Sequence, residues 1–124
     1  MALLIDTHAL VWLAEGSRKL SKKASEAIRA GDADLFVSAV TAFELADLAA
    51  RRRIPTTVEL GRLLDAFGMT VLDFPADLWR SASTLPYVHG DPVDRMLFAH
   101  AIHADMTLVT ADDKAPQYSV RTLW

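Results

Sequence analysis

The sequence of 124 residues predicts an α/β fold with a mostly parallel sheet of four or five strands. Short β-branched or apolar runs alternate with longer segments in which apolar residues recur at helical spacing. Serine, threonine, aspartate, glycine and proline stand between these segments, where helix ends and turns need them. Because 52% of the residues are hydrophobic and no repeat or linker divides the chain, we expect one domain over residues 1–124.

The N-terminal region is predicted to hold a strand and two helices. Residues 3–5 are an apolar run short enough for a buried strand. A helix is expected from there to Glu15, with Gly16 closing it in a left-handed conformation. Ser21 can cap the next helix, which Gly31 is expected to stop.

The middle of the chain begins with a predicted strand over residues 35–37. Thr41 and Glu44 have the spacing of a capping box, which predicts a helix from Thr41 to about Arg53. The remaining elements are a helix opened by Thr56 and Glu59 and ending near Gly68, a strand 69–72, a helix from Pro75 to Leu85, a helix opened by Asp91 and Pro92 and ending at His103, and strands 107–110 and 119–123.

Four carboxylates take related positions on this predicted map. Asp6 and Asp112 follow strands, whereas Glu44 and Asp94 lie in the first turns of helices. In a parallel α/β sheet, strand carboxyl ends and the helix starts that follow them share one edge, where ligands bind. The sequence does not reveal the strand order, so their convergence is an inference.

A shared pocket of four acids would be repulsive unless a cation neutralised it. Oxygen donors select hard ions, and the absence of cysteine excludes thiolate ligands, so Mg²⁺ or Mn²⁺ is the expected occupant. Such an ion can lower the pKa of a bound water and neutralise charge on a phosphoryl oxygen. This chemistry is phosphodiester hydrolysis.

Each acid also has a local explanation. Glu44 suits the capping box, Asp94 suits the positive end of its helix, and Asp112 could be a turn residue for which Asp113 competes. Asp6 is harder to explain locally, because an unpaired buried carboxylate is unfavourable.

The chain resembles PIN-domain ribonucleases, specifically the VapC-type toxins of toxin–antitoxin pairs. The resemblance rests on five runs in order, "LLIDTHALVWL", "LSKKASEAI", "VSAVTAFELA", "HGDPVDRMLFAHAI" and "TLVTADDKAPQY". It implies a three-layer α/β/α sandwich, one or two divalent ions, RNA as substrate, a homodimer and a VapB-like antitoxin that covers the site. The family's acids match Asp6, Glu44, Asp94 and Asp112, with Ser38 and Thr110 as supporting hydroxyls.

In the mechanism that this resemblance suggests, Asp6 and Asp94 hold the principal ion. Glu44 and Asp112 complete its shell, directly or through water, and orient the attacking water. RNA contact is expected from basic residues, foremost Arg51, Arg52 and Arg53, although a solvated helix end explains that run equally well.

Other functions have less support in the sequence than a nuclease. A net charge of −3 gives no overall sign of nucleic-acid binding. His100 and His103 have the spacing of two ligands of a transition metal, but the sequence offers no third ligand at a matching position. Arg95, beside Asp94, could form an ion pair with a nearby carboxylate. Asp6-Thr7-His8 lacks the second acid of an aspartyl phosphatase. The remaining alternative is a PIN-like module that binds RNA or protein but has no activity.

The sequence predicts a cytoplasmic protein, because neither a membrane span nor a secretion signal is expected.

Overall fold

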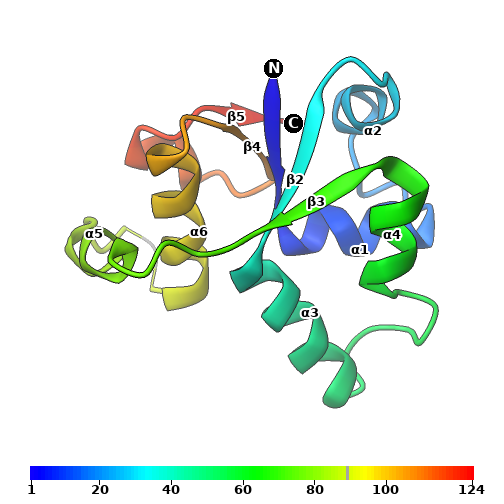
Figure 1. Ribbon diagram of the computed structural model, residues 1–124, viewed down its shortest axis with the longest axis horizontal. Helices are drawn as coiled ribbons and strands as arrows, with labels where there is room; N and C mark the ends of the chain where they lie inside the picture. Colours follow the sequence, from blue (N-terminus) through cyan, green and yellow to red (C-terminus); the bar gives the residue numbers. More distant parts are fainter. Residues whose placement is uncertain (89) are drawn as a thin grey trace.

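The computed structural model describes residues 1–88 and 90–124 and confirms the α/β prediction. All strand pairings are parallel, and the strand order is β3-β2-β1-β4-β5 (Figure 1). The strands are β1 (Ala2–Ile5), β2 (Asp34–Ser38), β3 (Met69–Leu72), β4 (Thr107–Val109) and β5 (Thr122–Leu123). The helices are α1 (Thr7–Glu15), α2 (Lys22–Arg29), α3 (Ala39–Ala50), α4 (Leu60–Phe67), α5 (Leu78–Thr84), α6 (Pro92–His103) and the 3₁₀ helix η1 (Ala115–Tyr118).

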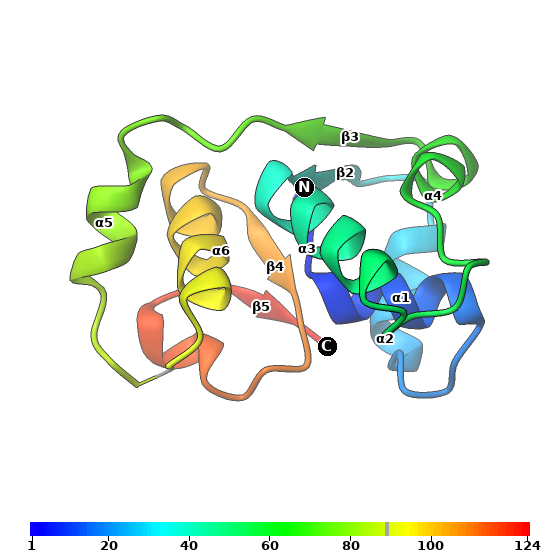
Figure 2. The same ribbon diagram turned by 90° about the horizontal axis from the view of Figure 1, so that it is seen from below.

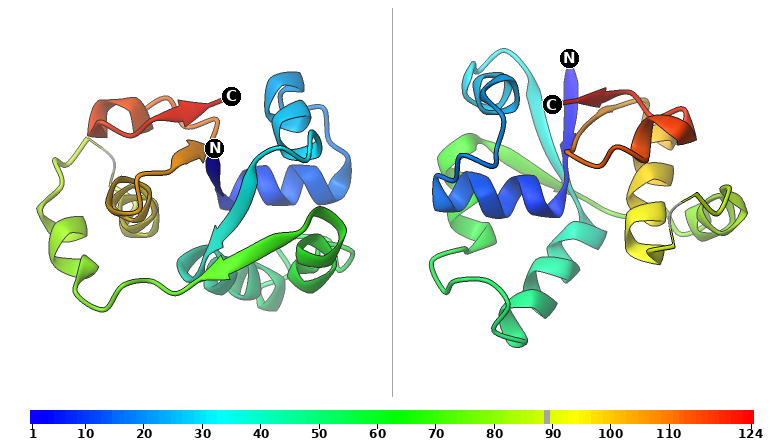
Figure 3. Two further views of the ribbon diagram at one scale, coloured as in Figure 1. Left: turned by 45° about the horizontal axis from the view of Figure 1, so that its top comes forward. Right: turned by 180° about the vertical axis from the view of Figure 1, so that it is seen from behind.

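The alternation of side chains along each strand builds a core on each face of the sheet. Leu3 and Ile5 of β1 pack with α1, α2 and α4, whereas Leu4 packs with α6 and η1. Figure 3 shows these two groups of helices on opposite sides of the strands. The layers are therefore helix, sheet and helix, as the resemblance implied. No helix in the described part of the chain is long and apolar enough to cross a membrane.

Local sequence signals placed several helix ends correctly. Gly16 ends α1 with φ 63°, in the left-handed conformation that glycine adopts without steric cost. The Ser21 hydroxyl accepts a hydrogen bond from Ala24 N at 3.0 Å and caps α2. Asp91 caps α6, with Pro92 as the first helical residue.

Three predicted helix starts were wrong. The third helix begins at Ala39, because Ser38 caps it by accepting from Val40 N at 3.1 Å. Thr41 is therefore inside α3, where it is buried. In α4 the cap is Glu59 itself, which accepts from Gly61 N, rather than Thr56. The fifth helix begins at Leu78, after a turn at Pro75 that closes from Leu78 N to Pro75 O.

Some predicted ends also differ from the structure. The third helix stops at Ala50 rather than near Arg53. The last strand covers only residues 122–123 of the predicted 119–123, because η1 precedes it and Ser119 adopts a left-handed φ of 60°. These differences shorten elements without changing the order of the fold.

Candidate active site at the carboxyl edge of the sheet

The strand order reverses between β1 and β4, and this position defines the candidate site. The chain moves from β1 outward through β2 to β3, and then returns to the other side of β1 to form β4. Asp6 continues directly from β1, and its backbone N donates to Val109 O at the end of β4 (3.1 Å). In open parallel sheets, ligands bind at this kind of switch point, beyond the carboxyl ends of the strands.

Asp6 has a structural contact that the sequence did not predict. Its Oδ1 accepts a hydrogen bond from Ala9 N at 2.8 Å, so Asp6 is the N-cap of α1. Burial raises the pKa of Asp6, and the neighbouring Asp112 carboxylate raises it further. Hydrogen bonds from Thr110 and Ala9 and the charge of His8 act in the opposite direction without reversing the shift. The fold thus holds a carboxylate where its negative charge is unfavourable.

Thr110 and Asp112 form the other half of the site. The Thr110 hydroxyl accepts from Asp112 N at 3.1 Å, and the same side chain hydrogen-bonds to Asp6. Asp112 Oδ1 accepts from Lys114 N at 2.9 Å, which fixes its turn, whereas Asp113 is exposed. Thr110 is buried between the two acids and therefore sets their relative position.

Asp94 and Glu44 come from the two helices beside this pair. Asp94 lies in the first turn of α6, and Figure 2 shows that turn on the same edge of the sheet as α3. Glu44 lies in the second turn of α3 rather than in the first, because α3 begins earlier than predicted. Both side chains are half-buried.

The structure brings Asp6 and Asp112 within electrostatic reach of each other. Among residues 1–88 and 90–124, no three histidine, aspartate or glutamate side chains are grouped closely enough to hold one ion. The four acids thus share an edge, and Asp6 and Asp112 interact with each other there.

Ser38, expected as a supporting hydroxyl, connects the sheet to α6. It is fully buried at the end of β2, and its Oγ lies 2.9 Å from His100 Nδ1. The His100 ring also packs edge-on against Phe74, and its pKa is lowered by burial and then by the charge of His103. Ser38 therefore positions the helix that carries Asp94.

We expect Ser38→Ala to lower the free energy of unfolding by about 2–3 kcal/mol. About 1 kcal/mol comes from the lost cap of α3, and the rest from leaving the buried His100 nitrogen without its partner. Urea unfolding would measure the change. Ser21→Ala is the matched control, because Ser21 caps α2 in the same way but makes no second contact, so it should lose only about 1 kcal/mol. Equal losses in the two variants would contradict the role of the Ser38–His100 hydrogen bond.

The predicted cationic residues differ in their exposure and in their contacts. Arg51, Arg52 and Arg53 are exposed directly after α3, and Arg51 pairs with Asp47 at 3.5 Å. Arg95 is buried and donates to backbone carbonyls rather than to a carboxylate. No local pattern in the sequence predicts this role, because the acceptors lie nine or more residues from Arg95. His89, which precedes Asp91 and Asp94 in the sequence, lies outside the described residues.

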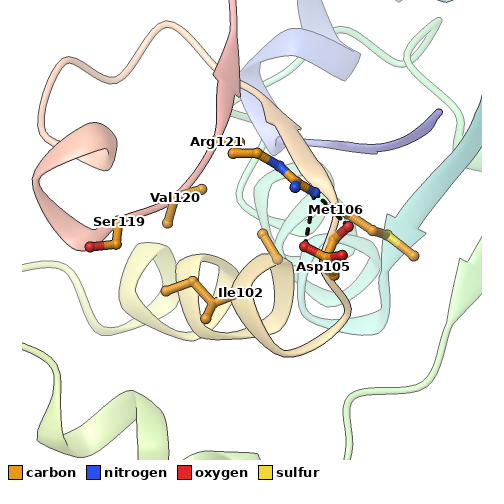
Figure 4. A pocket seen from close by; sticks show the side chains of 7 residues that line it. Ile102, Asp105, Met106, Ser119, Val120 and Arg121 are labelled. Carbon is orange, nitrogen blue, oxygen red and sulfur yellow. Dashed lines mark hydrogen bonds and ion pairs between the residues drawn. The ribbon is translucent and has the colours of Figure 1, made fainter.

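A hollow at the opposite end of the sheet contains no such pair of acids. It has a volume of about 190 Å³ and lies where β4 and β5 begin. Figure 4 shows Arg121 reaching across it to Asp105, with 3.0 Å between Nη2 and Oδ1. Because the two charges satisfy each other, this hollow offers no competing centre for an ion.

Comparison with known proteins gives a family and a fold. A family model described as "PIN domain" matches residues 3–121. Over 113 residues, the chain is 34% identical to ribonuclease VapC22 of Mycobacterium tuberculosis, which covers 89% of this chain and 86% of that protein. Among solved structures, the chain is similar to VapBC2 of Rickettsia felis bound to a promoter DNA fragment, with TM-score 0.71, 18% identity, and 98% and 97% of the two chains covered. It is also similar to FitAcB of Neisseria gonorrhoeae, with TM-score 0.67, 18% identity, and coverage of 97% and 95%. At these identities the solved structures support the fold alone.

Proposed function

The chain belongs to the PIN-domain family, and we propose that it is a metal-dependent endoribonuclease acting as the toxin of a VapBC-type pair. The ribonuclease activity is carried over from VapC22, whose similarity extends over most of both chains. The main support for the proposal is the half-buried carboxylate of Asp6, whose pKa is raised by burial and by Asp112, at the point where the strand order reverses.

The chemistry of this pair fits Mg²⁺ or Mn²⁺. Magnesium is usually held by one or two carboxylates and keeps several waters, so it does not need a cage of protein ligands. We propose that Asp6 and Asp112 hold one ion, and that Asp94 and Glu44 contact it through water. A bound ion would supply neutralisation of the negative charge that develops on the phosphodiester.

The residues of the chain have separate tasks in this proposal. The Thr110 hydroxyl orients both Asp6 and Asp112, and the Ser38–His100 contact fixes the helix that carries Asp94. Glu44 stands half-exposed on α3, where its carboxylate can accept a hydrogen bond from the attacking water. Arg51, Arg52 and Arg53 would contact RNA phosphates.

The proposal predicts that Mn²⁺ stabilises the folded protein. An ion that binds only the folded state raises the thermal midpoint, by the equivalent of about 2.7 kcal/mol at a hundredfold excess over the dissociation constant. Thermal unfolding with EDTA and with increasing Mn²⁺ measures this shift, and cleavage of total RNA under the same conditions tests the activity. An unchanged midpoint together with RNA binding but no cleavage would favour the inactive PIN-like module instead.

We further propose a VapB-like antitoxin and a homodimer as the partners. The solved structures that this chain is similar to include VapBC2, bound to a promoter DNA fragment, and FitAcB. Light scattering of the purified chain checks the homodimer, which should have twice the 13.6 kDa mass of one chain. Inhibition of cleavage by a co-expressed antitoxin checks the other partner.

A further inference from the structure

The surface between α5 and the start of α6 contains a hollow that the proposed reaction leaves unused. It has a volume of about 340 Å³, in the range of ligand sites. Its main lining residues, named here the aromatic pocket, are Trp79, Ala82, Tyr87, Pro92, Arg95 and Met96. We propose that the aromatic pocket binds an unpaired nucleobase of the RNA substrate, an inference that rests on the proposed ribonuclease function.

The aromatic pocket exposes an unusual amount of ring surface. Trp79 is 56% exposed and Tyr87 is 83% exposed, and Val88 beside them is also exposed. Large apolar side chains that gather on a surface mark a binding site more often than single ones do. Unpaired bases of RNA are commonly recognised by stacking on such rings.

Both rings are accompanied by a guanidinium. The Arg95 guanidinium lies over the Tyr87 ring, 4.1 Å from its centroid, and the Arg80 guanidinium lies over the Trp79 ring at 5.2 Å. Arg95 is itself held by four backbone carbonyls, so the cation beneath Tyr87 is fixed. A cation on one face of a ring leaves the other face available for stacking with a base. Its positive charge also favours binding of the phosphate next to that base.

The aromatic pocket adjoins the candidate active site through α6. Pro92 and Arg95 line the pocket, and Asp94 lies between them in the same helical turn. Neighbouring Cα atoms are about 3.8 Å apart, so the pocket begins within one residue of Asp94, one of the four acids of the proposed site. An RNA strand whose phosphate reaches the acids would therefore bring a neighbouring base to the rings.

The combination of rings and cations favours RNA over a protein as the occupant. A nucleotide carries a flat ring and an anionic phosphate in one unit, which complements two aromatic rings that each have a guanidinium. A second copy of the chain, or an antitoxin segment, could cover the rings with apolar side chains but would have no need of the two positive charges. These protein occupants are contrary outcomes of the experiment below.

The experiment compares two short single-stranded probes in EDTA, where no metal-dependent cleavage occurs. One probe is a fluorescein-labelled oligouridylate, and the other is the same ribose-phosphate backbone without bases. We expect fluorescence anisotropy to show that the wild-type chain binds oligouridylate at least about tenfold more tightly than the abasic probe. A Trp79→Leu, Tyr87→Leu double variant should bind both probes equally. Ile102→Ala, which removes an exposed apolar side chain at the other end of α6, should keep the preference.

The outcomes separate the aromatic pocket from the nuclease proposal. If the double variant keeps an unchanged thermal midpoint and still prefers oligouridylate, the pocket does not bind the base. If it instead changes oligomeric state or antitoxin affinity and keeps the base preference, the pocket is a protein interface and the inference is overturned. Loss of the preference supports the pocket even if cleavage with Mn²⁺ is absent, because that absence would count against the nuclease alone.

Discussion

Asp6→Asn is expected to abolish RNA cleavage and, in EDTA, to make the protein more stable than the wild type. Asparagine has nearly the same shape and keeps an oxygen that can accept from Ala9 N, so the cap of α1 is retained. The substitution removes a half-buried negative charge that the folded state disfavours. Loss of this preorganised charge should reduce cleavage at least about a hundredfold, and it should remove stabilisation by Mn²⁺.

The stability gain from Asp6→Asn should depend on pH in a defined direction. Because the pKa of Asp6 is raised in the folded state, the wild type loses stability as pH increases from the unfolded value, about 3.9, through the folded value. Below that window both states are protonated, so the two proteins should unfold at similar urea concentrations. Toward neutral pH the variant should become the more stable protein. Urea midpoints measured in EDTA across this range test the sign.

Asp113→Asn is the matched control for Asp6→Asn. Asp113 is exposed and follows Asp112 directly, so its replacement removes one negative charge near the site but leaves the Asp6 carboxylate in place. It should retain cleavage and show no comparable gain in stability. Wild-type cleavage by Asp6→Asn, or a less stable Asp6→Asn protein at neutral pH, would mean that Asp6 is only the cap of α1.

The elements that the sequence predicted well are those with local causes. Gly16 could be placed at the end of α1 because a left-handed residue there needs no distant contact. The start of α6 could be predicted because Asp91 and Pro92 alone provide its cap and its first residue. Thr41 and Glu44 have the correct spacing for a capping box, yet Ser38 already caps the helix three residues earlier. Thr41 is instead buried, with its hydroxyl 3.5 Å from that of Thr7 on α1. Tertiary packing therefore overrode the local pattern.

The same distinction between local and distant causes applies to the candidate site. The positions of Asp6 and Asp112 after strands could be predicted, because a short apolar run and its end are visible in the sequence. Their pairing requires β4 to lie beside β1. This strand order is not visible in any local pattern of the sequence. The contact between Ser38 and His100 joins residues 62 positions apart and could not be found from spacing for the same reason.

Arg95→Ala is expected to lower the free energy of unfolding by about 3 kcal/mol, because backbone carbonyls lose hydrogen bonds to a charged donor and are left without a partner. The last carbonyls of a helix have no partner within the helix, and the Arg95 guanidinium supplies donors to those at the end of α5. Nη2 donates to Leu85 O at 2.7 Å, to Ala82 O at 3.0 Å and to Ser83 O at 3.3 Å. Nη1 donates to Pro86 O at 2.8 Å.

Two comparison variants show whether the guanidinium fork is what matters at Arg95. Arg62→Ala removes an exposed guanidinium that lies 3.6 Å from Glu59, so urea unfolding should show a change below about 0.5 kcal/mol. Arg95→Lys keeps the charge but not the planar set of donors, and it should recover only part of the stability. Full recovery with lysine would show that charge at the end of α5 is sufficient. A loss for Arg95→Ala no larger than that for Arg62→Ala would mean that water replaces the guanidinium at these carbonyls, and that α5 is held to α6 by its apolar contacts alone.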